Sequence, residues 1–184
     1  MKLTVSEVTK TMTSCKRQSA RTTVHRCIRR CAAILCAFTV LSAAAKAATV
    51  RDNFSSQSWS NNDGTVNWSG DWIEVDGNST PPSPGSGNVQ ITGGELRLDD
   101  RPNTGGDPGV ARQVNLAGAV TATLTFDWRT TVQIESSDSV IVEVSSNGGS
   151  SWTTLQNFTN LNGGESGSNS YNLLPYASAT TQVR

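Results

Sequence analysis

Two stretches of the chain alternate between apolar and polar residues, and this pattern constrains the fold more than any other feature. Thr121–Arg129 (TATLTFDWR) puts Ala, Leu, Phe and Trp on one face and Thr, Asp and Arg on the other. Asp138–Ser145 (DSVIVEVS) puts three valines on one face, with Ile and Glu opposite. Successive side chains of a β-strand point to opposite faces of its sheet. The alternation therefore predicts half-buried antiparallel strands.

Shorter strand candidates surround these two, and no window carries the apolar spacing of an amphipathic helix. Turn-forming pairs, Gly93-Gly94 and Asn147-Gly148, separate neighbouring candidates. Many short strands joined by such turns predict an all-β fold, an antiparallel β-sandwich of the jelly-roll type. The shorter candidates are Val50–Phe54, Asp71–Val75, Asn88–Ile91, Glu95–Leu98, Val110–Val114, Trp152–Phe158, Ser170–Leu174 and Thr180–Arg184. Loops are expected at Asp76–Gly87, Asp99–Gly109 and Thr159–Asn169, which are rich in Gly, Pro, Ser and Asn.

The chain divides near residue 47 into two pieces of opposite charge. Residues 1–47 hold nine Lys or Arg and one acid, whereas residues 48–184 hold six Arg and fourteen Asp or Glu, a net charge of −8. The first piece contains an uncharged apolar run, Cys31–Ala45, and ends in Ala45-Lys46-Ala47, a small-x-small cleavage pattern. We therefore expect residues 1–47 to be an export signal cleaved near Ala47. Residues 48–184 are then one β-sandwich domain of a secreted or cell-surface protein.

Two alternatives for the first piece stay open. The apolar run is shorter than the roughly 20 residues of a membrane span, so a stable span after cleavage is not expected. An uncleaved signal would instead anchor the protein through residues 31–45. Translation from Met12 rather than Met1 would give the signal a more ordinary length.

The composition of residues 48–184 excludes several functions. Every Cys and the single His precede residue 48, so that part has no cysteine nucleophile, Ser-His-Asp triad or thiolate or imidazole zinc site. Its negative charge argues against nucleic acid as a partner. No cofactor is expected, and a structural calcium, which needs only oxygen ligands, is left open with no ligand residues assigned. Candidate oxygens come from Asp52, Asp63, Asp71, Asp76, Asp99, Asp100, Asp107 and Asp138.

Several segments resemble a known family in their order along the chain. They are Asp52-Asn53-Phe54, Asn67–Trp72 (NWSGDW), Thr123–Arg129 (TLTFDWR) and Asp138–Trp152 (DSVIVEVSSNGGSSW). Together they are similar to bacterial cell-surface jelly-roll modules, MAM-like domains of the concanavalin A-like sandwich group. The resemblance implies a non-catalytic extracellular binding or adhesion module. The chain lacks the family's cysteines, and Tyr171–Arg184 (YNLLPYASATTQVR) resembles the approach to a final core strand that ends just as it begins.

Three tryptophans are the candidate ligand-binding residues. Trp59, Trp68 and Trp72 lie among Ser, Asn, Asp and Gly, and aromatic rings beside amides and carboxylates suit sugar rings. The alternative is that they fill the core; it is favoured for Trp72, which lies in a strand pattern, and left open for Trp59 and Trp68. Trp128 and Trp152 are expected in the core.

One carboxylate pair leaves an enzyme as an alternative. Glu74 and Asp76 resemble the start of the E-x-D-x-x-E strand of laminarinase-type glucanases, in which the carboxylates act as nucleophile, assistant and acid. Asn78 and Ser79 stand where the closing acid belongs. We therefore expect no enzymatic activity. We expect a secreted module that binds extracellular polysaccharide or a surface protein, with an incomplete glucanase or a spacer of a larger adhesin as alternatives.

Overall fold

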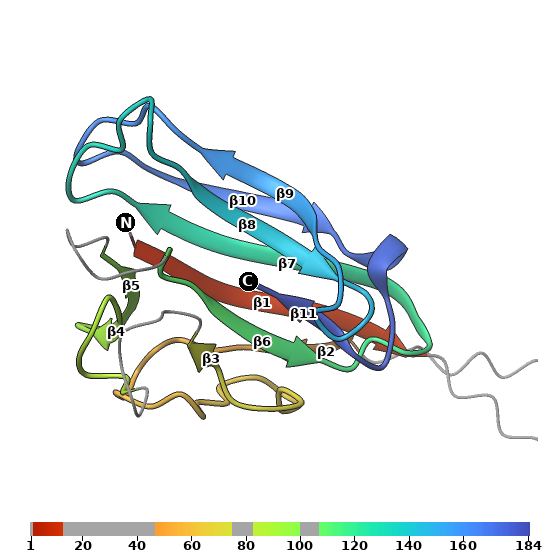
Figure 1. Ribbon diagram of the computed structural model, residues 1–184. Helices are drawn as coiled ribbons and strands as arrows, with labels where there is room; N and C mark the ends of the chain where they lie inside the picture. Colours follow the sequence, from red (N-terminus) through yellow and green to blue (C-terminus); the bar gives the residue numbers. More distant parts are fainter. Residues whose placement is uncertain (1, 13–46, 75–82, 100–106) are drawn as a thin grey trace, which may run out of the picture.

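The protein folds as an antiparallel β-sandwich, as the alternation predicts (Figure 1). The computed structural model describes residues 2–12, 47–74, 83–99 and 107–184; within 2–12 it describes the backbone. All strand pairs in these ranges are antiparallel. Their helical element is one 3-10 turn, η1 (Leu174–Tyr176). No helix in the described ranges is long and apolar enough to cross a membrane; residues 31–45 lie outside them.

Six strands form one sheet, in the order β10-β7-β1-β5-β4, with β2 also paired to β1. Five strands form the other, in the order β3-β6-β11-β8-β9. The strands of the first sheet are β1 (Lys2–Met12), β2 (Ala47–Val50), β4 (Val89–Thr92), β5 (Glu95–Leu98), β7 (Ala119–Arg129) and β10 (Ser166–Asn172). Those of the second are β3 (Ile73–Glu74), β6 (Val110–Val114), β8 (Val140–Ser145), β9 (Thr153–Phe158) and β11 (Thr181–Val183).

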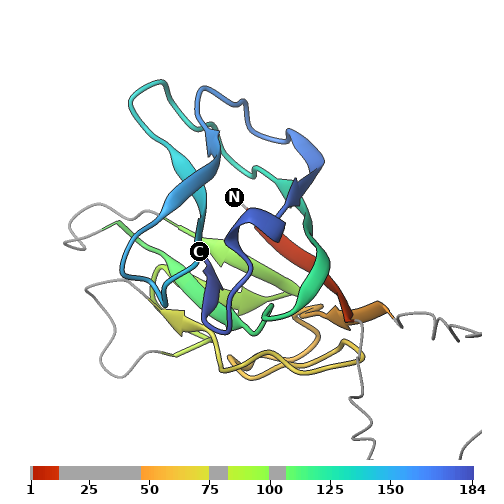
Figure 2. The same ribbon diagram turned by 90° about the vertical axis from the view of Figure 1, so that its right-hand side faces the viewer.

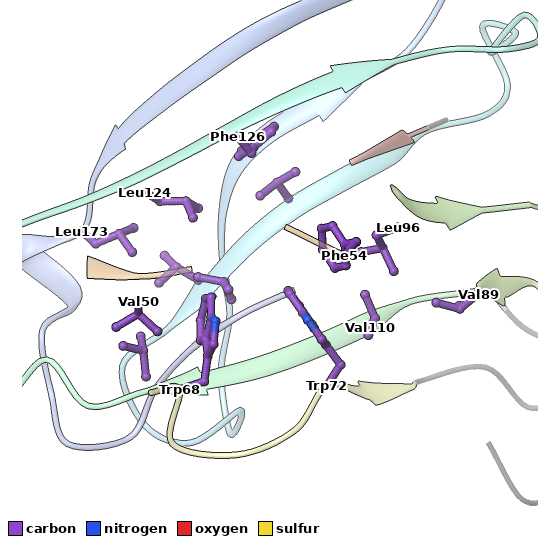
Figure 3. Close-up of a cluster of buried hydrophobic side chains, with 14 of the residues drawn as sticks. Val50, Phe54, Trp68, Trp72, Val89, Leu96, Val110, Leu124, Phe126 and Leu173 are labelled. Carbon is purple, nitrogen blue, oxygen red and sulfur yellow. The ribbon is translucent and has the colours of Figure 1, made fainter. Parts of the chain in front are cut away.

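The core lies between the two sheets. Leu124 and Phe126 of β7 are each 1% exposed, and Val142 and Val144 of β8 belong to the same buried cluster. Trp68 and Trp72, which lie in the long segment between β2 and β3, also pack in this core (Figure 3). The apolar side of both alternating stretches thus faces inward, which confirms the faces assigned to them from the sequence.

Most strand predictions are confirmed within a few residues. The tight turn between β4 and β5 has φ of +61° at Gly93 and +75° at Gly94, backbone angles that glycine adopts without strain. Two predictions are wrong. The segment expected as a strand at Val50–Phe54 leaves the sheet at Val50, where β2 ends. The expected loop Thr159–Asn169 contains the first half of β10, which pairs with β7 from Ser166 onward.

Strand β1 lies within the residues assigned to the export signal. It runs antiparallel to β7 from the Lys2–Arg129 pair to the Met12–Ala119 pair, with irregularities after Val5 and after Thr11. Figure 1 shows it in red beside β7, and Figure 2 shows the orange β2 beside its end. The signal and its cleavage stay predictions, because residues 13–46 lie outside the described ranges.

Candidate functional site

A buried ion pair connects the loop after β2 to the centre of strand β6. Nη1 of Arg112 lies 2.7 Å from Oδ2 of Asp52, and both side chains are 0% exposed. Arg112 occupies the inward register of β6 between Val110 and Val114, which are also buried. A charged pair removed from water needs hydrogen bonds to its remaining polar atoms.

The loop that surrounds the pair supplies three such hydrogen bonds, whereas Nη2 of Arg112 is buried without a hydrogen-bond partner among the described residues. The backbone N–H of Phe54 donates to Oδ1 of Asp52 at 2.7 Å, and Nε1 of Trp72 donates to Oδ2 at 2.8 Å. Arg112 Nε donates to the carbonyl of Gly70 at 2.9 Å. The first bond closes a short turn in which Phe54 has a φ of 54°, unusual for a residue with a side chain. Asp52 therefore fixes the loop as well as neutralising Arg112.

Burial shifts the ionisation of both partners. Desolvation raises the pKa of Asp52 above its ordinary value, against the opposing effects of the Phe54 N–H, the Trp72 indole and the Arg112 charge. Desolvation likewise lowers the pKa of Arg112, against the attraction of Asp52. Three donors, the Phe54 N–H, the Trp72 indole and the Arg112 guanidinium, therefore share the two oxygens of Asp52.

The structure places two of the three candidate tryptophans in the core around this pair. Trp68 is 5% and Trp72 4% exposed, and their ring centroids lie 5.8 Å apart. The guanidinium carbon of Arg112 lies 4.9 Å from the Trp68 ring centroid and 5.6 Å from that of Trp72. Neither ring offers a face to a sugar in this conformation, and the core alternative describes both (Figure 3).

Trp59 differs from the other two because part of it reaches the surface. It is half-buried and packs against the core, and its carbonyl accepts the backbone N–H of Trp72 at 2.9 Å. Its indole Nε1 is buried and has no hydrogen-bond partner in the described part of the chain. The neighbouring loop carries hydroxyl and amide groups, including Ser60 and Asn62, which are exposed. Of the three candidates, Trp59 is the one that a ligand can reach.

The candidate carboxylate pair is placed only in part. Glu74 ends β3, opposite Val110 of β6, and its side chain is half-buried. Asp76 lies outside the described residues. The separation of the two carboxyl groups, on which a glycosidase depends, is therefore not defined, and the glucanase alternative stays a prediction.

A tryptophan assigned to the core from the sequence lies instead on the outer face of the five-stranded sheet. Trp152 precedes β9, is half-buried, and is not among the core residues. The guanidinium carbon of Arg184 lies 4.2 Å from its ring centroid. Nη2 of Arg184 lies 2.6 Å from Oε2 of Glu143, to which its Nε also donates. The prediction for Trp152 was wrong, because Arg184, rather than the core, covers its ring.

Polar side chains extend this outer face across neighbouring strands. Val142, Val144 and Val183 point into the core, so the residues that alternate with them, Glu143 and Gln182, point outward. Gln182 lies opposite Gln113 of β6 and donates an amide hydrogen to it at 3.4 Å. Thr154 of β9 donates its hydroxyl to Glu143 at 3.3 Å. We call Gln113, Glu143, Trp152, Thr154, Gln182 and Arg184 the outer-face cluster.

The outer-face cluster offers one aromatic ring, two amides, a hydroxyl and an ion pair within one strand layer. Gln182 and Trp152 lie close together, since a Cβ added at Gly149 would meet both, at 2.9 Å and 3.4 Å. These groups can donate and accept hydrogen bonds while the ring provides apolar contact. In the described part of the chain, no three or more His, Cys, Asp or Glu side chains gather where they could hold a metal ion.

Comparison with protein-family models, with curated proteins and with solved structures finds no match for this chain. The resemblance to MAM-like modules therefore stays a prediction. What is shown is the antiparallel β-sandwich, its buried Asp52–Arg112 pair and the outer-face cluster.

Proposed function

We propose that the domain is a secreted, non-catalytic module that binds a neutral extracellular polysaccharide through the outer-face cluster. The observation that carries this proposal is the position of Trp152, beside the Gln182 amide and outside the core. Sugars offer an apolar face of C–H groups and a rim of hydroxyls. An aromatic ring next to amides and carboxylates matches both parts of that chemistry.

The charge of the domain supports a neutral glycan rather than an acidic one. Residues 48–184 carry a net charge of −8, which repels anionic polymers at low ionic strength. Within the cluster, the Arg184 charge is already paired with Glu143. An acidic sugar would have to compete with this carboxylate for the guanidinium group.

The arrangement of the cluster also suits an extended ligand. Gln113, Gln182 and Glu143 come from β6, β11 and β8, which are adjacent in the sheet. Adjacent strands lie about 4.8 Å apart, so these three side chains span about 10 Å across the strands. A polysaccharide lying across the strands meets each side chain in turn.

The test is a pull-down of the purified chain with insoluble neutral polysaccharides, followed by titration of soluble fragments of any that bind. We expect Trp152→Ala to weaken binding at least about tenfold, corresponding to about 1.4 kcal/mol, and Gln182→Ala to weaken it less. The matched control is Val132→Ala, which truncates an exposed side chain, 68% accessible, in the loop after β7. Each variant is first checked for an unchanged unfolding midpoint.

Two outcomes would overturn the proposal. One is binding that is unaffected by Trp152→Ala but lost in Trp59→Ala, which would move the site to the loop before β3. The other is the absence of binding to any neutral polysaccharide by the wild-type chain. Turnover of a β-glucan, abolished by Glu74→Gln, would instead support the glucanase alternative.

A further inference from the structure

Strand β1 fills a slot one strand wide in the six-stranded sheet. On one side it pairs with β7 over ten register positions. On the other it pairs with β5 at its beginning, through Lys2 and Leu3, and with β2 towards its end, through Val8 to Thr11. Neighbouring strands lie about 4.8 Å apart, so β7 and the β5–β2 side stand about 10 Å from each other. That gap accepts one extended chain and no more.

Without β1, the backbone pairing of the described strands of this sheet is interrupted between β7 and β5, although the Arg129–Glu95 ion pair would still link these two strands. Strand β7 would keep β10 as its neighbour, and β5 would keep β4. Two rows of backbone N–H and C=O groups would then face each other without partners. Unpaired strand edges readily accept another chain, and here two edges would bind the same strand at once.

The predicted export cleavage would vacate this slot. Ala47, where cleavage is expected, is the first residue of β2 and pairs with Thr11 of β1. A cut there separates β1 from every other strand in the described part of the chain. Translation from Met12 would likewise leave out all of β1 except its last residue. The secreted domain would therefore keep the acceptor edges and lose the strand that fills them.

The buried side of β7 defines what sequence the slot accepts. Leu124 and Phe126 are each 1% exposed, so an incoming strand needs apolar residues at the positions opposite them. In β1 these positions are Val8 and Val5, with one register shift between them. A polar residue, Glu7, lies opposite Thr125 between them, and Lys10 lies opposite the buried but small Ala122, so the apolar requirement applies to the positions opposite Leu124 and Phe126.

We propose that the slot is a binding site for an extended strand of another polypeptide, which enters antiparallel to β7 with apolar residues opposite Leu124 and Phe126. The ligand is a protein segment rather than a glycan. This inference rests on the cleavage that the proposed secreted function assumes, and it is independent of the outer-face cluster.

The experiment uses the full chain with a specific protease site inserted after Arg30, so that β1 can be cut from the domain after folding. The probe is an isotope-labelled synthetic peptide of residues 2–12 (KLTVSEVTKTM), added in excess to the cut protein. We expect it to replace the cut segment and co-elute with the domain. The control peptide carries Val8→Pro and Thr9→Pro. Successive N–H groups of a strand point to opposite neighbours, so these prolines remove one donor towards each side of the slot.

Hydrogen exchange of β7 provides an internal check on folding. Amides of β7 that point towards β10 should stay protected in every state. Amides that point towards β1 should lose protection when the cut segment is washed away and recover it, by at least about tenfold in rate, when the labelled peptide binds.

Three results would overturn the proposal: no exchange of the labelled peptide into the cut protein, equal binding of the proline peptide, or loss of protection on both sides of β7 when the strand is removed. The last would mean that the domain does not persist as an acceptor. Polysaccharide binding by the same samples is measured separately, so a failure of the outer-face cluster is distinguished from a failure of the slot.

Discussion

Replacing Arg112 by methionine tests whether the buried ion pair maintains the loop that carries the tryptophans. The substitution keeps an unbranched apolar stem but removes the charge that lies 2.7 Å from Asp52. It also removes the hydrogen bond to the Gly70 carbonyl. Asp52 would be left fully buried, with the Phe54 N–H and the Trp72 indole as its remaining donors.

The expected cost follows from what is left unpaired. Removing one partner of a buried pair typically destabilises a protein by about 3–5 kcal/mol, because the other charge stays buried without compensation. The lost hydrogen bond adds about 1 kcal/mol, and the apolar packing of methionine beside two indole rings offsets a similar amount. We therefore expect Arg112→Met to lower the free energy of unfolding by about 4 kcal/mol. For a domain with a total stability of about 5–15 kcal/mol, this is a large fraction.

Urea unfolding followed by tryptophan fluorescence measures the change, since Trp68 and Trp72 surround the pair. A shift of the midpoint at constant slope reports stability alone. The comparison variants are Asp52→Asn and the double variant that carries both changes. Removing both charges leaves no unpaired ion, so the double variant should be more stable than the sum of the single effects predicts, by about 1–3 kcal/mol. A cost below about 1 kcal/mol for Arg112→Met, or strictly additive single effects, would refute this reasoning.

Three further predictions concern other parts of the fold. Gly64→Ala should destabilise the domain by about 1–3 kcal/mol, because its Cβ would clash with the Thr49 carbonyl oxygen. Gly70→Ala should cost far less by the same urea assay, because no atom of the described residues lies within 4 Å of the added Cβ. Tyr171→Phe should cost about 1 kcal/mol, because its hydroxyl donates to Gln156 at 2.8 Å and links β10 to β9; an unchanged midpoint would contradict this. Burial raises the pKa of Asp52 in the folded state above its value in the unfolded chain. The contribution of Asp52 to the free energy of unfolding is therefore fully present below the unfolded-state pKa and is lost as pH rises through the folded-state pKa. The stability of wild type relative to Asp52→Asn should therefore decrease with rising pH, and an increase would show that the Arg112 charge and the hydrogen bonds outweigh desolvation.

Strands that bury one face could be predicted from the sequence, because apolar and polar residues alternate along such a strand. The limits of β5 and β6 are those expected at Glu95–Leu98 and Val110–Val114. Strand β10 shows where this signal ends. Its sequence, SGSNSYN, is rich in Ser, Asn and Gly, residues that favour turns. Pairing with β7 over seven register positions overrides that preference, and such a tertiary effect leaves no local pattern.

The candidate site could be predicted only in its residue types. The polar residues that flank Trp68 do not decide between a surface and a core position, yet it packs against Arg112, which is 44 positions further along the chain. Asp52 and Arg112 are likewise 60 positions apart, and no spacing rule connects them. Trp152 lies beside a strand whose alternation suggested burial, but Arg184 covers its ring on the outer face. Long-range partners decided each of these positions.

Two interpretations, an export signal and a sheet strand, apply to the residues of β1. Lys2–Met12 is rich in Thr and Val, which favour strands, and it also precedes an apolar run that is typical of an export signal. An export signal is removed, whereas a strand with neighbours on both sides stabilises its sheet. The two interpretations are compatible if they apply at different times, with β1 completing the sheet before cleavage and another strand taking its position afterwards. The edges of β7 and β5 that pair with β1 lie outside the predicted signal, so after the predicted cleavage they would still require a strand between them.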